Sequence, residues 1–454
     1  MIILSIPYKN KQSLLSRLPA FTDLVEYRID YAEDISEIET GLFTKKDIIT
    51  LRDISEDGKT QIDDTTKKNF FNQILSSTES FFDCEYIFLR RNKDFSVPTE
   101  RLILSLHTQV SDKQTIFEFL STDIKAAFYK LAISCNDLNE LLEMSKMFPA
   151  DKISKMIIVP MYPCPLIFRL LYKLYGSQAT YAYLNEETAL NQPSLALASH
   201  CRIKNITPDT DVYVIIGSKQ IIESMSIVIL NFCYARNKFN YVMLPVIAET
   251  ANEALEIINQ LKANTNLKGV AITMPFKKQI PAIVTGKDII TNSWIPDTNQ
   301  FANTDEHAMK IALDKLKILN SRSVLIVGTG ATSESTQKVL KEKGFSKVQV
   351  ITRKQINQIR EGMQADVKDF LFEIKYDLLI NCTPFGLEDT DNPDLLPDFE
   401  ALIDLPYGSK NTTLTDKAIK EQIPHINGTT FWKWQANEQG KFFGLELNLD
   451  KMLI

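Results

Sequence analysis

The chain has 454 residues, more than a single hydrophobic core usually holds, so two or three domains are expected. Its 44% hydrophobic and 24% charged residues are typical of a soluble globular protein, and its net charge of −6 argues against nucleic-acid binding. No apolar run reaches the ~20 residues of a membrane span, the start lacks the basic region of a signal peptide, and the six scattered cysteines have no metal-like spacing. We therefore expect a cytoplasmic protein with no membrane partner and no metal.

Short β-favouring runs recur through the first ~185 residues, with helix-length segments between them. This alternation predicts an α/β fold, and eight such runs predict a compact (β/α)8 TIM barrel. The expected strands are Ile2–Ile6, Leu24–Ile29, Asp47–Leu51, Tyr86–Leu89, Leu102–Leu106, Ala126–Ile133, Met156–Pro160 and Ala179–Leu184.

Polar residues stand near the ends of these runs, where the strands of such a barrel converge on one active site. Lys130 lies within the sixth run, and burial beside Tyr129 and Leu131 would favour the neutral amine that a Schiff-base nucleophile needs. His107 follows the fifth run and would move protons near neutral pH. Taken singly, Lys130 also fits a helix-surface lysine and His107 a turn residue. Their shared register with strand ends favours a site.

Several of these segments resemble type I 3-dehydroquinate dehydratase over nearly all of residues 1–200. They read VEYRIDY (25–31), IITLRD (48–53), LSLHTQ (104–109), FYKLA (128–132) and ALNQ (189–192). The resemblance implies that Lys130 forms an imine with the substrate ketone, while His107 takes the adjacent proton and then assists loss of water. It also implies substrate contacts at Glu26, Arg28, Arg52, Glu56, Arg169, Thr188 and Gln192. The chain departs from the family at Phe168, where serine is usual.

A polar segment, residues 200–211, places a domain boundary near 205. Beyond it, strand-like runs alternate with a helix that Thr250 and Glu253 would open as a capping box, which predicts an α/β half-domain. Ser224 and Ser226 lie close together near a helix start, where they fit either a carboxylate cradle or a helix cap.

Residues 323–354 read SVLIVGTGATSESTQKVLKEKGFSKVQVITRK, a strand, a glycine turn, a helix and a second strand. This order suits a dinucleotide pyrophosphate, because glycine allows close approach and the helix N-terminus offers free N–H groups. The basic pair Arg353 and Lys354 at the second strand's end favours NADP over NAD. An ordinary βαβ unit with a tight turn is the alternative.

The second half resembles shikimate dehydrogenase from about residue 212 to the C-terminus, in segments such as GVAITMPFK (269–277), NTD (303–305), NCTPFG (381–386) and NGTTFWKWQA (427–436). The resemblance implies that Lys277 and Asp305 are catalytic. It implies substrate contacts at Ser224, Ser226, Thr273, Asn292 and Gln435, and cofactor contacts at Gly328, Thr329, Gly330, Ala331, Thr352, Arg353, Lys354, Thr383 and Gly428. Departures from the family include Ala271, Phe301 and Ala331.

Together the resemblances imply a bifunctional, cytoplasmic enzyme of aromatic amino acid biosynthesis that dehydrates 3-dehydroquinate and then reduces 3-dehydroshikimate to shikimate with NADPH. The expected domains are the barrel (1–205), a substrate-binding domain (206–310), a Rossmann NADP-binding domain (311–430) and a C-terminal helix (431–454) that returns to the substrate-binding domain. We expect small-molecule substrates and a monomer. Two alternatives stay open: a non-catalytic binding or regulatory protein on the same folds, and an oxidoreductase that uses quinate.

Overall fold

The computed structural model describes residues 1–454 apart from 16, 353, 357–374, 409 and 452–454. The described chain divides into two compact units, Met1–Leu267 and Lys268–Ile454. Within these described residues, every helix is too short or too polar to span a bilayer. This division does not test the domain limits expected near residues 205, 310 and 430, so those limits remain predictions.

Unit 1 opens with eight parallel strands in the order β7-β6-β5-β4-β3-β2-β1-β8, which confirms the predicted barrel. The Gln178 N–H beside β8 donates to the Met156 carbonyl of β7 at 2.8 Å, which brings the two edge strands together. The strands are β1 (Ile2–Pro7), β2 (Leu24–Arg28), β3 (Asp47–Thr50), β4 (Phe81–Glu85), β5 (Leu102–Gln109), β6 (Phe128–Ser134), β7 (Met156–Met161) and β8 (Thr180–Tyr183).

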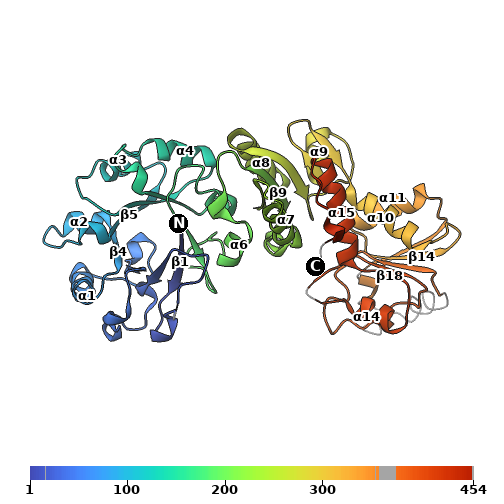
Figure 1. Ribbon diagram of the computed structural model, residues 1–454, viewed down its shortest axis with the longest axis horizontal. Coiled ribbons are helices and arrows are strands. Elements are labelled where there is room, and N and C mark those ends of the chain that lie inside the picture. The colour runs from blue at the N-terminus through green and yellow to red at the C-terminus, as the bar shows by residue number, and fades with distance from the viewer. Residues whose placement is uncertain (16, 353, 357–374, 409, 452–454) are drawn as a thin grey trace. The chain divides into compact units, whose positions relative to one another are not determined.

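Helices cover the outside of these strands, as the blue-to-green part of Figure 1 shows. They are α1 (Asp64–Ser77), α2 (Tyr86–Arg91), α3 (Lys113–Leu120), α4 (Leu138–Lys146), α5 (Leu166–Leu170) and α6 (Leu195–His200). Aspartates open three of them, since Asp63, Asp112 and Asp137 each accept a backbone N–H of the first turn.

The prediction for the fourth strand was wrong. The strand is Phe81–Glu85, and the predicted run Tyr86–Leu89 forms helix α2. The strand carries Asp83 and Glu85, both buried, and charged residues inside a strand argue against it in a single sequence. Each carboxylate is compensated in three dimensions, Asp83 by Arg52 and Lys130, and Glu85 by Lys67 of helix α1.

The barrel interior is built in layers, because alternate residues of a strand point to the same face. Ile3, Ile48 and Ile103 belong to one buried apolar cluster at the N-terminal ends of the strands. Two residues further along the same strands stand Ser5, Thr50 and Ser105, all buried. An apolar floor therefore lies beneath a layer of hydroxyl groups.

Unit 1 continues with β9 (Asp211–Gly217) and β10 (Tyr241–Ile247), which pair in parallel. Between them lie the π-helical turn η10 (Ser226–Leu230) and α7 (Asn231–Arg236), and α8 (Ala251–Asn264) follows. The Thr250 hydroxyl accepts the Glu253 N–H, which confirms the expected start of α8. The Leu138 N–H of α4 donates to Gln260 of α8 at 2.9 Å, so this segment packs against the barrel.

Unit 2 holds a Rossmann-like parallel sheet in the order β15-β14-β16-β17-β18, as the dinucleotide motif predicted. Its strands are β14 (Ser323–Val327), β15 (Lys347–Ile351), β16 (Leu378–Asn381), β17 (Leu402–Asp404) and β18 (His425–Ile426). Antiparallel pairs join β11 (Asn266–Ile272), β12 (Ser293–Ile295) and β13 (Gln300–Ala302). The helices are α9 (Gln279–Thr285), α10 (Thr304–Leu316), α11 (Ala331–Glu342), α14 (Thr413–Lys420) and α15 (Gly428–Phe442), of which α10 and α15 pack together (Figure 1).

The buried pair between Lys67 and Glu85 gives a first prediction. Lys67→Met would leave the Glu85 carboxylate buried without its cation, and breaking such a pair costs about 3–5 kcal/mol. We expect the urea-unfolding transition of the barrel to lose stability on this scale. The neighbouring Lys68→Met is the control, because Lys68 pairs with the 71% exposed Asp94 and should change stability by less than about 1 kcal/mol. Equal losses in both variants would contradict the assignment.

Candidate active sites

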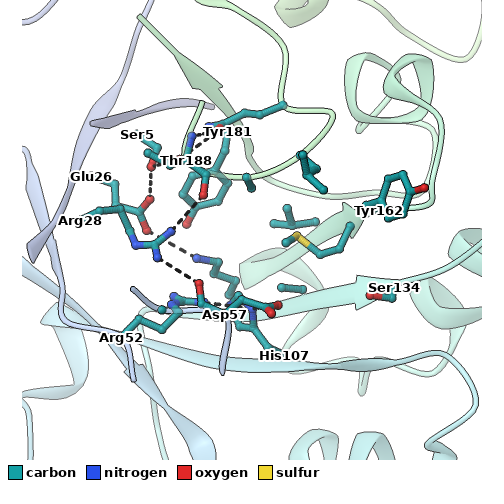
Figure 2. Close-up of a pocket in the computed structure, with 18 of the residues that line it drawn as sticks. Ser5, Glu26, Arg28, Arg52, Asp57, His107, Ser134, Tyr162, Tyr181 and Thr188 are labelled. Atoms are coloured by element: carbon teal, nitrogen blue, oxygen red, sulfur yellow. Dashed lines mark hydrogen bonds and ion pairs between the residues drawn. The ribbon is translucent and has the colours of Figure 1, made fainter. Parts of the chain in front are cut away.

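A cavity of about 540 Å³ opens at the C-terminal ends of the barrel strands. The predicted residues Glu26, Arg28, Arg52, His107, Lys130, Arg169, Thr188 and Gln192 all line it. Figure 2 shows Glu26, Arg28 and Arg52 on one side of this space, with Ser134 and Tyr162 on the other. The structure therefore brings together residues that lie up to 166 positions apart, counted from Glu26 to Gln192.

Lys130 on β6 lies at the centre of a buried ion-pair network, and its side chain is 6% exposed. Its Nζ is 2.7 Å from Asp83 Oδ2 and 3.6 Å from Glu26 Oε1. Although burial alone would raise the pKa of Asp83, the charges of Lys130 and Arg52 hold it well below its usual value. Asp83 is one residue of the network that the sequence did not predict, because its strand was misplaced.

The two carboxylates are supported by the hydroxyl layer of the barrel. Glu26 accepts the hydroxyls of Ser5 and Thr50, the latter at 2.9 Å, and Asp83 accepts the hydroxyl of Ser105. Hydrogen bonds of this kind favour the ionised carboxylate, so both groups stay negative beside Lys130. For Glu26, burial works in the opposite direction, but Lys130 and Arg28 lower its pKa.

His107 on β5 is held through one side of its ring. Its Nδ1 is 3.1 Å from Arg52 Nη1 and 3.9 Å from Asp57 Oδ2. Because a guanidinium only donates, Nδ1 accepts and the proton of the neutral ring sits on Nε2. Burial and then the Arg52 charge lower the pKa of His107 to about 3. Nε2 is buried and has no hydrogen-bond partner among the described residues.

The three arginines of the cavity differ in their partners. Arg28 forms a two-pronged pair with Asp30, at 2.8 and 2.7 Å, and Arg52 pairs with Asp83 at 3.0 Å. Arg169 is buried yet contacts no carboxylate in the described part of the chain. Its guanidinium donates to the Met161 sulfur at 3.4 Å, and burial lowers the pKa of Arg169 to about 10. Arg169 is thus a cation that can accept an anion from a ligand.

The loop after β3 places Asp57, rather than the predicted Glu56, against the cavity. Asp57 has a left-handed backbone conformation, φ +64°, and its carbonyl accepts from Arg28 Nη2 at 3.4 Å. Glu56 is half-buried and does not line the cavity, and burial followed by the neighbouring Glu85 raises its pKa to about 7. The loop therefore presents Asp57, rather than Glu56, to His107.

Thr188 and Gln192, both predicted substrate contacts, form one polar group in the wall of the cavity. Thr188 Oγ1 lies 2.8 Å from Ser5 Oγ and 2.9 Å from Gln192 Oε1.

A second network lies within unit 2. Lys277, just after β11, has its Nζ 2.6 Å from Asp305 Oδ2 in the first turn of α10. Asn292 donates to Asp305 Oδ1 at 2.9 Å, and Gln435 of α15 donates to Thr304 Oγ1 at 2.8 Å. Lys277, Asp305, Asn292 and Gln435, all predicted site residues, therefore form one connected cluster.

The glycine turn between β14 and α11 fits a dinucleotide phosphate. Gly328 has φ +112°, and a Cβ there would lie 2.7 Å from the Thr383 Cγ2 methyl. Gly330 caps α11 with no side-chain hydrogen bond among the described residues, and a Cβ there would meet open space. The first turn of α11 thus keeps N–H groups for an anion. Thr332 Oγ1 lies 3.4 Å from Lys277 Nζ, which places this turn beside the lysine–aspartate cluster.

The other predicted cofactor contacts are placed as follows. Thr383 donates its hydroxyl to Asn381 at 2.8 Å, and Gly428 opens helix α15. Thr352 uses its hydroxyl locally, accepting the Gln355 N–H at 3.1 Å. Lys354 is exposed at the end of the second strand, and Arg353 lies outside the described residues.

Comparisons with known proteins match the two halves separately. The family described as "Type I 3-dehydroquinase" matches residues 2–201, and the "Shikimate dehydrogenase substrate binding domain" matches residues 215–288. A "3-dehydroquinate dehydratase" of Sulfolobus acidocaldarius is 30% identical over 199 residues, 42% of this chain and 87% of the relative. A "Shikimate dehydrogenase (NADP(+))" of Prochlorococcus marinus subsp. pastoris is 31% identical over 239 residues, 44% of this chain and 82% of the relative. The chain belongs to both families.

The solved "Dehydroquinate dehydratase and shikimate dehydrogenase from S. pombe AroM" aligns with 99% of this chain and 96% of its own, at 17% identity and a TM-score of 0.38.

Several residues depart from the pattern of the shikimate dehydrogenase family, and the structure accounts for one of them. Phe301 on β13 stacks on Trp294 of β12, with ring centroids 5.5 Å apart and planes within 1°. Ala271 pairs with Ser293 across the β11–β12 ladder, and Ala331 begins α11. In the dehydratase half, Phe168 is fully buried in α5.

The predicted substrate contacts Ser224, Ser226 and Thr273 make local hydrogen bonds. Ser224 Oγ accepts the Ser226 N–H at 3.2 Å, a turn-like bond between residues two positions apart, whereas Met225 is the residue at the N-cap position of η10. Thr273 Oγ1 lies 3.3 Å from the Met274 carbonyl oxygen. A carboxylate cradle at the two serines stays a prediction.

The environment of His107 gives a second prediction. A neutral ring whose pKa lies near 3 binds no proton between pH 8 and pH 5, whereas an ordinary histidine titrates near pH 6.5. We expect the NMR signals of the His107 ring to show no titration step in that range, with the signals assigned by their loss in His107→Gln. A step near pH 6.5 would contradict the proposed environment.

The low pKa of His107 also makes stability depend on pH, because the unfolded chain takes up a proton there near pH 6.5 and the folded protein only near pH 3. The free energy of unfolding therefore keeps the His107 contribution above pH 6.5 and loses it as the pH falls towards 3.

Proposed function

We propose that this bifunctional enzyme of the shikimate pathway dehydrates 3-dehydroquinate through an imine on Lys130 and reduces 3-dehydroshikimate to shikimate at Lys277 and Asp305. The observation that supports the first step is one cavity that combines a buried lysine, a neutral histidine and an unpaired arginine. The observation that supports the second is the lysine–aspartate pair beside the glycine turn.

In the dehydratase cavity, Arg169 binds the substrate carboxylate, because it is the buried cation without a carboxylate partner among the described residues. Glu26 and Arg28 bind ring hydroxyls. The Lys130 amine adds to the ketone carbon, the ketone oxygen leaves as water, and a C=N bond forms. The positive nitrogen then attracts the electron pair of the neighbouring C–H bond.

His107 moves the one proton of the elimination twice. It takes the proton from the carbon beside the imine, and the C–H electrons pass through an enamine and expel the hydroxyl group. The same proton leaves with that hydroxyl as water. Hydrolysis of the imine then restores the Lys130 amine and releases the unsaturated ketone, so the overall change is the loss of one water.

The two partners of His107 Nδ1 fit this proton movement. With Arg52 donating to Nδ1, the ring proton occupies Nε2, the tautomer that donates. To accept a substrate proton, Nε2 needs its lone pair, so Nδ1 must carry the proton and donate it. Asp57, at 3.9 Å, supplies the acceptor for that tautomer. The loop carrying Asp57 therefore sets the base-competent state.

In the dehydrogenase half, the bound NADPH supplies the hydride. Lys277 donates the proton that the new alcohol oxygen requires, and Asp305 holds the ammonium in place. Asn292 fixes the second oxygen of Asp305, and Gln435 reaches the same cluster through Thr304. The turn at Gly328 and Gly330 would hold the pyrophosphate, and Lys354 with Arg353 would bind the 2′-phosphate.

In this proposal the protein is a monomer in the cytoplasm, and its partners are its small-molecule substrates.

The dehydratase proposal predicts a covalent adduct. Borohydride added with 3-dehydroquinate should reduce the imine and leave a stable adduct on Lys130, found by peptide mass spectrometry. Lys152→Ala, which removes a buried lysine bound to backbone carbonyls outside the cavity, should keep the adduct, and Lys130→Ala should lose it. An adduct-free Lys130 in active wild-type protein would refute the imine.

The reductase proposal predicts a selective loss. Lys277→Ala and Asp305→Asn should each lower reductase turnover by at least about tenfold, the scale of a lost acid–base group. The dehydratase rate of the same protein serves as an internal control and should not change. Lys278→Ala, which removes the adjacent half-exposed pair with Glu334, should keep reductase turnover within about twofold. Near-wild-type rates in both site variants would remove the assigned roles.

A further inference from the structure

Tyr181 of β8 is a cavity residue that the assigned site does not use. Its side chain is 4% exposed, and it lines the cavity of the barrel. Lys130 Nζ lies 4.4 Å from the centre of the Tyr181 ring, so the tyrosine directly contacts the nucleophile. In Figure 2, Tyr181 lies beside Ser5 and Thr188.

The Tyr181 hydroxyl is buried and has no hydrogen-bond partner among the described residues. This distinguishes it from the Ser5, Thr50 and Ser105 hydroxyls of the same barrel, each of which donates to a carboxylate. A buried hydroxyl without a partner is costly, so a native protein keeps one where a ligand or a water completes it. Burial, followed by the charges of Glu26 and Asp83, raises the pKa of Tyr181 well above its ordinary value. The group therefore remains protonated and available as a donor.

The neighbours of Tyr181 define what it would bind. Its ring contacts the amine that attacks the ketone, so an oxygen near the hydroxyl belongs to the same small molecule that Lys130 holds. The cavity's cations and carboxylates recognise the rest of that molecule, as argued above. A neutral phenol adds a donor without adding charge, which suits an alcohol or carboxylate oxygen of a cyclic keto acid.

We propose that Tyr181 is a further substrate-positioning residue of the dehydratase, whose hydroxyl donates a hydrogen bond to an oxygen of the keto acid bound at Lys130. This deepens the proposed dehydratase function and rests on it. The aromatic ring places the hydroxyl, since the cation of Lys130, and of the imine formed from it, is attracted to the ring face. Tyr181 is thus fixed to the reacting nitrogen by its ring and to the substrate by its oxygen.

Tyr181→Phe tests this, because it removes one oxygen and keeps the ring. The chain offers a matched control in Tyr172, which is also buried with an unpartnered hydroxyl but does not line the cavity. We expect Tyr181→Phe to lower the dehydratase kcat/KM about tenfold, the scale of one hydrogen bond, and Tyr172→Phe to leave it unchanged. Neither variant should lower Tm, since each removes a buried polar atom that the free protein does not satisfy.

The outcomes separate this proposal from the dehydratase function itself. A raised KM at constant kcat, or a lowered kcat, would each support it, and the split tells whether the bond forms with the bound substrate or only in the transition state. Wild-type kcat and KM in Tyr181→Phe, with an active wild-type enzyme, would overturn it and leave the dehydratase function standing. A wild-type protein without dehydratase turnover would instead overturn the function first, and this proposal with it.

Discussion

The barrel depends on the contact between Lys130 and Asp83. A lysine in the interior is stable as a cation only when a carboxylate compensates for the water it has lost. Asp83 provides this at 2.7 Å and also binds Arg52, while Ser105 holds its other oxygen. The carboxylate in turn needs both cations to stay ionised in this environment. Neither charge is stable there alone, so the strands β3, β4 and β6 must keep their register for the site to exist.

This network also divides the work among the other charged groups. Arg52 binds Asp83 through Nη2 and contacts His107 through Nη1, and burial followed by the Arg52 charge lowers the pKa of His107 so that the imidazole stays neutral. Arg28 is engaged by Asp30. Arg169 is left with no carboxylate among the described residues, so the cavity offers an incoming anion one open cation. The same pairing that stabilises the fold therefore leaves a neutral imidazole at His107 and, at Arg169, a cation that no described carboxylate contacts.

The sequence pattern placed Lys130 within an apolar run and His107 directly after one, and the family resemblance named the arginines; all of these residues line the cavity. Asp83 and Asp57 were missed for different physical reasons. Asp83 interrupts its strand with a charge whose partners lie just after β3 and on β6, and a local pattern does not contain those partners. Asp57 faces the cavity because of a left-handed backbone at φ +64°, which shifts the acidic position by one residue from Glu56. Tyr181 has the pattern of an ordinary strand tyrosine, and only the three-dimensional structure shows that its buried hydroxyl lacks a partner among the described residues.

The proposed function uses a lysine beside an aspartate in both halves for different chemistry, and the two pairs differ in their surroundings. The side chains of Lys130 and Asp83 are 6% and 0% exposed, and a second cation, Arg52, and a second carboxylate, Glu26, contact them. Lys277 and Asp305 are each 13% exposed and are fixed by neutral amide and hydroxyl groups. In the proposed function the nucleophile therefore lies in an enclosed site where several charged groups act on it, whereas the proton donor is fixed by one carboxylate and keeps partial contact with water.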